Sequence, residues 1–183
     1  LTGSLPNVRV ECMAIESFTA LESWLARAER LVSAHGTVIV DLPAVIGPAM
    51  ASAFLLARVI LVPVSLSPVD IDGTMRVLRY IRAAREERQG EGPEVLIVPN
   101  KLPRTVGLER SFHDRLGQMG EPLAPGLTLF PEHGRAFAEG RWIGDAAPGS
   151  TAHAEILALE RTLAAAMQKA PPAPRPDAAR RSR

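Results

Sequence analysis

The chain contains very little cysteine: Cys12 is the only one among 183 residues. A single thiol cannot form an internal disulfide or a metal site made of several thiolates, so both are excluded for an isolated chain. Cys12 lies in an apolar, strand-like run, which predicts a buried and unreactive thiol. A cytoplasmic protein is the expectation that best fits this cysteine usage.

Net charge is also small, because 21 Lys and Arg residues offset 20 Asp and Glu residues and leave +1 at pH 7. No field of the whole molecule draws such a protein toward nucleic acid or a membrane, so any such contact must be local. No apolar run reaches the roughly 20 residues of a membrane-spanning helix. The first residues also lack the basic-then-apolar pattern of a signal peptide. We therefore expect a soluble domain without stable membrane association.

Segments of strand and helix character alternate along the chain. Strands are predicted at 8–13, 37–41, 58–64, 94–100 and 126–130, and helices at about 18–34, 48–57, 68–88, 108–119 and 150–168. Several of the strands are apolar throughout, as strands in the middle of a covered parallel sheet are. Because hairpin signals are absent, the expected fold class is α/β, a mostly parallel open sheet with helices on both faces.

Cap residues mark the starts of two of these helices. Thr19 and Glu22 have the spacing of a capping box, and Ser67 is the expected N-cap of the helix that begins at Pro68. Pro68 and Asp70 suit the first turn of a helix, where a fixed φ and a negative charge are favourable. This position explains Asp70 without a catalytic role.

The apolar periodicity ends near residue 168. We expect one domain over 1–168, followed by a Pro- and Arg-rich tail over 169–183 that is too poor in apolar residues to fold.

Polar residues follow the expected strands at their carboxyl ends, where ligands of open α/β sheets bind. Asp41 follows the run 37–40, and Asn100 follows the run 94–99. Nucleoside-triphosphate enzymes place an acid at such a position because Mg²⁺ prefers oxygen ligands. The alternative is structural: Asp41 is then a turn carboxylate before Pro43, and Asn100 a turn residue that ends a strand.

Four stretches in order, VIVDLP, ILVPVSLSPVDIDG, LIVPNKLPR and PEHGRAFAEG followed by DAAPGSTA, resemble the ParA/MinD family of deviant-Walker P-loop ATPases. The resemblance covers nearly all of residues 8–168. It implies a P-loop NTPase-like fold, binding of ATP and Mg²⁺, and a role as a switch in plasmid or chromosome partitioning.

The resemblance also implies roles for single residues. Asp41 matches the acid after the switch II strand, which positions the Mg²⁺ shell indirectly through water and makes it the catalytic-site candidate. Pro43 matches the start of the moving switch. Asn100 and Pro131 match positions on the adenine side of the nucleotide. Pro103 stands where GTPases carry the acid that reads guanine, so selectivity for guanine has no basis here.

The first strand and the phosphate-binding loop of that family are missing from the printed sequence. A P-loop needs a lysine after its last glycine, and the only lysines are Lys101 and Lys169, neither of which follows a glycine. Two explanations stay open. The loop precedes Leu1, which is not a methionine, or the protein is a degenerate relative that has lost hydrolysis. The chain as printed is expected not to hydrolyse ATP, whereas a full-length form with the loop is an expected ATPase.

The resemblance leads to one main hypothesis, in which ATP orders the segment after Asp41, permits a homodimer and favours non-specific DNA binding, with a ParB-like partner stimulating hydrolysis. Arg79, Arg82, Arg85 and the basic tail are the candidate DNA contacts, unless they form only a solvated surface. A non-hydrolysing adaptor and a small-molecule ligase of the same superfamily are the alternatives. His113, His133 and His153 have no metal-site spacing, so surface or capping roles are expected.

Overall fold

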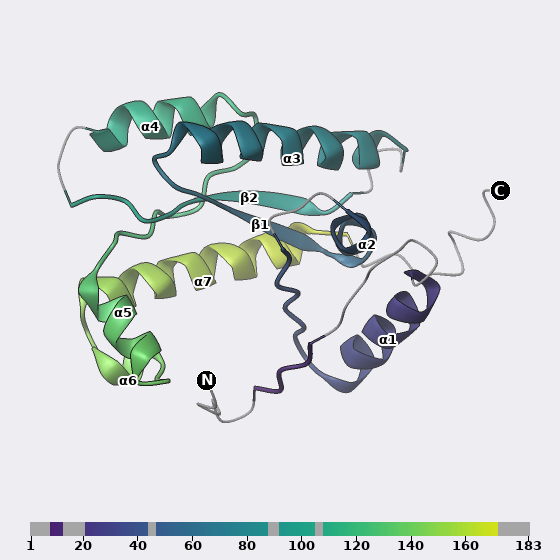
Figure 1. Ribbon diagram of the computed structural model, residues 1–183, viewed down its shortest axis with the longest axis horizontal. Coiled ribbons are helices and arrows are strands. Elements are labelled where there is room, and N and C mark those ends of the chain that lie inside the picture. Colours follow the sequence, from purple (N-terminus) through teal and green to yellow (C-terminus); the bar gives the residue numbers. More distant parts are fainter. Residues whose placement is uncertain (1–7, 13–20, 44–46, 88–91, 105–107, 172–183) are drawn as a thin grey trace. The chain divides into compact units, whose positions relative to one another are not determined.

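The computed structural model describes residues 8–12, 21–43, 47–87, 92–104 and 108–171 (Figure 1). They belong to two compact units. The first comprises the described parts of Leu1–Val10, Val59–Arg79 and Glu94–Ala170. The second comprises those of Glu11–Arg58, Tyr80–Pro93 and Pro171–Arg183. Each unit is considered by itself below.

The first unit is built on a parallel pair of strands, β1 (Val59–Val64) and β2 (Glu94–Pro99). Helix α3 (Pro68–Glu87) lies between them in the chain, because parallel neighbours need a long crossover connection. The α/β class expected from the sequence is confirmed. In the part of the chain that the structure describes, the sheet has two strands rather than the larger open sheet that was expected.

The segment 122–129, called the edge segment below, lies along β2 on the side away from β1 and does not form a regular strand. Ile97 bridges Leu123 and Leu102 bridges Thr128, both in parallel orientation. Backbone hydrogen bonds of 2.8–3.0 Å join residues 122–129 to β2 and to the turn that follows it. The strand predicted at 126–130 therefore exists only as an irregular edge, with its direction parallel to β2.

Gly126 allows this edge to approach the turn after β2. A Cβ on Gly126 would lie 2.5 Å from the Cδ1 of Leu102, which is a buried side chain. We expect Gly126→Ala to lower the free energy of unfolding by about 1–3 kcal/mol, as overpacking does. Gly134, inside helix α5 (Pro131–Ala138), is different, because a Cβ added there would meet no atom within 4 Å.

The matched control is therefore Gly134→Ala, which should raise the free energy of unfolding by about 0.5–1 kcal/mol because alanine favours a helix. Denaturant unfolding of both variants measures the difference. Similar changes in the free energy of unfolding for the two variants would show that the Leu102 side chain moves aside without lowering stability.

Burial differs sharply between the two strands. Residues 95–99 of β2 are all buried, as predicted for a strand covered on both faces. In β1, Val62 and Val64 are buried, whereas Leu61 is 39% exposed and Pro63 is exposed. The prediction of two covered faces is therefore wrong for β1, which has a single neighbour among the described strands. Pro63, which lacks an N–H, is compatible with such an edge strand.

Helices lie on both sides of the pair in Figure 1: α3 and α4 (Leu108–Gly117) on one side, α7 (Thr151–Lys169) on the other. The cluster on the α7 side contains Leu96, Val98 and Ala166. Successive residues of a strand point to opposite faces, so Ile97 points away from α7. Ile97 has no exposed surface, and neither do Leu78 of α3 and Leu116 of α4.

A smaller core joins α5, α6 (Ile143–Ala146) and the start of α7. Its buried residues are Ala136, Ile143 and Ala152, one from each helix. Two of the three are alanines, and small side chains at a contact let helices approach one another closely. This core holds α5 next to the start of α7.

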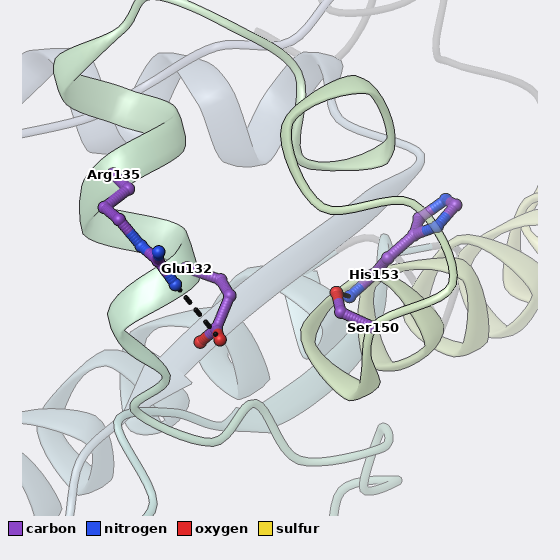
Figure 2. A network of polar contacts seen from close by, with 4 residues as sticks. All are labelled: Glu132, Arg135, Ser150 and His153. Atoms are coloured by element: carbon purple, nitrogen blue, oxygen red, sulfur yellow. Dashed lines mark hydrogen bonds and ion pairs between the residues drawn. The ribbon is translucent and has the colours of Figure 1, made fainter.

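Ser150 caps helix α7, which begins where the sequence predicted the start of the last helix. Its Oγ accepts a hydrogen bond from the backbone N–H of His153 at 3.1 Å (Figure 2). Ser150→Ala removes this acceptor, so we expect the free energy of unfolding to fall by about 1 kcal/mol. Ser150→Gly should cost only a few tenths of a kcal/mol, since glycine is also tolerated at this position. Equal midpoints for Ser150→Ala and the wild type in thermal unfolding would contradict a stabilising cap.

The second unit contains the helices α1 (Leu21–Ala34) and α2 (Pro48–Leu56), both predicted. Trp24 and Ala28 of α1 are buried, whereas Val32 is 57% exposed. Thr19 and the side chain of Glu22 lie outside the described residues, so the predicted capping box is not described.

Two predicted strands are wrong over the described residues. Residues 8–12 and 37–41 have irregular conformation, and Val10 and Ile39 are each 87% exposed. A strand persists only where a neighbour pairs with its backbone groups, and no described residue pairs with either segment in this way. Cys12 is consequently exposed rather than buried.

The C-terminal helix α7 extends to Lys169, so the expected tail does not begin at that residue. Residues 172–183, which make up most of the predicted tail, lie outside the described part of the chain. None of the described helices has the combination of length and apolar character needed to cross a membrane.

Candidate functional site

The carboxyl ends of β1 and β2 meet at one edge of the first unit because the strands are parallel. The backbone N–H of Asn100, directly after β2, donates to the carbonyl oxygen of Val64 at 2.8 Å. Ser65 follows Val64 at the same edge. In open α/β sheets this is the edge where ligands bind.

Asn100 forms a tight local turn with Lys101. Its Oδ1 accepts a hydrogen bond from the Lys101 N–H at 2.9 Å. Lys101 has φ of 52°, and no other non-glycine residue in the described part has a positive φ. The left-handed conformation costs a residue with a Cβ about 1–2 kcal/mol. Such strain is concentrated at ligand sites, where the surrounding structure maintains it.

The start of α5 reaches the same edge. Because Leu102 bridges Thr128, the residues that follow Thr128 continue alongside the turn after β2. Pro131 is the first residue of α5, a position that suits its fixed φ. The guanidinium carbon of Arg104 lies 5.6 Å from the centre of the Phe130 ring, within cation–π range. The structure therefore brings Asn100 and Pro131 to one edge.

Asp41 and Pro43 belong to the second unit, whereas Asn100 and Pro131 belong to the first. Asp41 and Pro43 lie in irregular chain and are exposed. Asp41 was expected at the exit of a buried strand, and this local environment is wrong: Val40 before it is 46% exposed.

Asp70 has the helix-start position expected for it. It lies in the first turn of α3, and its carboxylate accepts a hydrogen bond from the Ser65 hydroxyl. Its carbonyl oxygen accepts from the Thr74 hydroxyl at 2.8 Å. These contacts connect the turn after β1 to α3, so a structural role explains Asp70.

His153 and His133 differ in their hydrogen-bond partners. His153 caps a turn, since its Nδ1 accepts from the Gly149 N–H at 3.3 Å and its ring meets Trp142 edge-on at 5.8 Å. The capping role expected for it is confirmed. His133 is different: its Nε2 is buried and has no hydrogen-bond partner among the described residues.

Glu132 neighbours His133 in the first turn of α5. Its Oε1 accepts from Arg135 at 3.3 Å in a largely exposed ion pair (Figure 2). Its Oε2 is buried and has no partner in the described part of the chain. An exposed pair of this kind contributes at most about 1 kcal/mol.

One contact of the edge was not predicted from the sequence. Glu155, in the second turn of α7, accepts from the Thr128 N–H at 2.7 Å and from the Thr128 hydroxyl at 2.8 Å. The two residues are 27 positions apart. No local pattern marks such a pair, because it depends on how α7 packs against the edge.

A multi-ligand metal centre is not present in the described residues, which contain no group of three or more His, Cys, Asp or Glu side chains arranged to hold an ion. A Mg²⁺ bound mainly through nucleotide phosphates and water needs only one or two carboxylates. The donor set of Asp41 fits an indirect contact of that kind.

A comparison of the chain with models of protein families found no match, and a comparison with curated proteins found none.

Proposed function

We propose that the protein is an ATP-dependent dimerising switch of the ParA/MinD type, with the adenine side of the nucleotide at the carboxyl edge of β1 and β2. The observation that supports this most is the common edge shared by Asn100, Lys101 and the start of α5. In open α/β sheets, ligands occupy the crevice outside the carboxyl ends of the strands.

Asn100 has the chemistry that an adenine edge requires. Its Oδ1 is partly occupied by the Lys101 N–H, and its side-chain NH₂ has no partner in the described part of the chain. An amide oxygen has two lone pairs, so one acceptor site and two donors stay available. In the proposal these groups bind the ring nitrogens and the amino group of the base.

The switch in this proposal is the segment that contains Asp41 and Pro43. Residues 37–43 are described as irregular chain, and Ile39 is 87% exposed. An exposed segment whose backbone pairs with no described strand is the kind of element that ligand binding can order. Bound ATP would supply the phosphate charge and Mg²⁺ that hold such a segment. Asp41 would hold the Mg²⁺ waters, and Pro43 would begin the moving part.

The phosphate cradle of the proposal requires glycines and a lysine that the printed sequence does not contain. This absence favours one other candidate, a non-hydrolysing adaptor on the same scaffold. The adaptor would use the edge to hold a protein partner and would not bind ATP. A ligase of the same superfamily would bind ATP but would not need DNA.

DNA binding, a homodimer and a ParB-like stimulating partner belong to the proposal, as does a role in partitioning. Arg79 is exposed on α3 and keeps its place as a candidate phosphate contact. Arg85 differs, because its guanidinium donates to the carbonyl oxygen of Pro93 at 2.7 and 3.1 Å. Phosphate contacts through arginine would make DNA binding fall steeply with salt concentration.

The test is the affinity of the whole gene product for ATP, measured by calorimetry with Mg²⁺ and again with EDTA. The switch predicts ATP binding that Mg²⁺ strengthens, and weaker binding of GTP. Retention of DNA across a salt series then separates the switch from the ligase. Absence of ATP binding in both buffers would reject the switch and favour the adaptor.

A further inference from the structure

We propose that Glu155 is a positioning residue for the base side of the site, because its carboxylate holds the edge segment that leads into α5. The second half of this proposal rests on the proposed function, since it assumes that a nucleotide base binds at this edge. The first half, that Glu155 positions the segment, does not depend on any ligand.

Both oxygens of Glu155 are used by one residue. Oε2 accepts from the backbone N–H of Thr128 and Oε1 accepts from its hydroxyl, at 2.7 and 2.8 Å. Hydrogen bonds to an ionised carboxylate are shorter and stronger than those between neutral groups. Two of them on one residue restrain both its backbone and its side chain. Glu155 therefore determines where Thr128 lies against α7.

Thr128 is also the residue that connects the edge segment to the turn after β2. It bridges Leu102, and the Leu129 N–H next to it donates to the Leu102 carbonyl oxygen at 2.9 Å. Asn100 lies two residues before Leu102 in the chain, and Pro131 lies three residues after Thr128. A displacement of Thr128 would consequently change the spacing between Asn100 and Pro131.

The direction of the Thr128 N–H makes the carboxylate necessary. The N–H groups of Leu127 and Leu129 donate to the carbonyl oxygens of Pro99 and Leu102, so the Thr128 N–H between them points away from β2, where no described strand pairs with it. Glu155 supplies the missing acceptor from a helix instead. The side chain of Glu155 is partly buried, so water replaces it only in part. The position of the edge is thus controlled from α7.

The experiment compares ATP with tripolyphosphate, which carries the same phosphates without a base, for the whole gene product with Mg²⁺. Glu155→Ala should weaken ATP binding about tenfold, a change typical of a displaced contact, and leave tripolyphosphate binding within about twofold. Glu155→Gln should recover most of the ATP affinity because its amide oxygen still accepts from the Thr128 N–H. Glu160→Gln, an exposed glutamate on the same helix, is the matched control and should change neither.

A structural role without positioning would lower stability and leave the ratio of the two affinities unchanged. Equal losses for ATP and tripolyphosphate, or no loss for either, would therefore overturn the base-side role of Glu155. Failure of the wild type to bind ATP at all would instead reject the proposed function, and with it the base-side half of this inference.

Amide hydrogen exchange decides the ligand-independent half in every case. In Glu155→Ala, the Leu102 and Leu129 amides should lose protection, because their hydrogen bonds join the two segments. The Asn100 amide, which bonds to β1, should keep its protection. Unchanged exchange at Leu102 and Leu129 would show that Glu155 does not position the edge.

Discussion

Replacing Ile97 with alanine is expected to lower the free energy of unfolding by about 3–4 kcal/mol, the largest effect on stability that we predict. Ile97 is at the centre of β2 and has no exposed surface. Its N–H donates to the Pro122 carbonyl oxygen at 2.9 Å, and its carbonyl accepts from Ala124 at 2.8 Å. Backbone pairing on this side prevents the strand from moving into the cavity, so the site collapses poorly.

The matched control is Leu61→Ala in β1. Leu61 is 39% exposed, so its truncation removes less buried surface and leaves a site open to water. Its expected cost is about 1 kcal/mol or less. Chemical denaturation with both variants gives the comparison. Losses of equal size would mean that β2 is no better packed than β1.

Replacing Asp41 with asparagine is expected to weaken binding of Mg²⁺–ATP at least tenfold, the largest functional effect that follows from the proposed switch. The substitution keeps the size of the side chain and removes its charge, so it tests the interaction with the metal shell. A loss of about 1.4 kcal/mol of interaction corresponds to that factor. In EDTA the variant and the wild type should bind ATP equally, since the Mg²⁺ is then absent.

Asp114→Asn on α4 is the control for the change in net charge, because Asp114 is also an exposed aspartate. Asp114→Asn should leave the affinity for ATP unchanged, both with Mg²⁺ and with EDTA. Calorimetry with the whole gene product measures all of these constants. Equal affinities of Asp41→Asn and wild type for Mg²⁺–ATP would remove Asp41 from the site and with it the switch assigned to the segment 37–43.

Local patterns predicted much of the fold correctly. The apolar runs at 59–64 and 94–99 are strands, and α7 begins next to Ser150, where the last helix was expected. The helices predicted at 68–88 and 108–119 also exist, and they contribute the fully buried Leu78 and Leu116 to the core. These predictions succeed because turn chemistry, caps and helical periodicity act over a few residues.

The predicted strand 37–41 failed for the opposite reason. Val38, Ile39 and Val40 have the composition of a strand, yet no described residue pairs with them and Ile39 is 87% exposed. Composition measures how well side chains suit a sheet surface, and it does not supply the neighbour whose backbone groups must be paired. The same limit explains why Leu61 is exposed in a strand that reads as fully buried.

The candidate site also contains residues that the sequence predicted and contacts that it did not. Asn100 was predicted from its place after an apolar run, and Pro131 from the resemblance; the structure puts both at one sheet edge. The positive φ of Lys101 and the bonds from Thr128 to Glu155 had no signal in the sequence. Conformational strain and contacts 27 residues apart arise only when helix and sheet are packed together.

The sequence by itself determined the class of the fold, the positions of β1, β2, α3, α4 and α7, and the polar residues at the ends of β1 and β2, but it did not predict α5 and α6. Only the tertiary structure decided which strand is covered on both faces and which residue of α7 holds the edge. The physical reason is the sequence separation of the interacting residues. Caps and periodicity depend on residues close together in the chain, whereas burial and strand pairing depend on segments that come together only on folding.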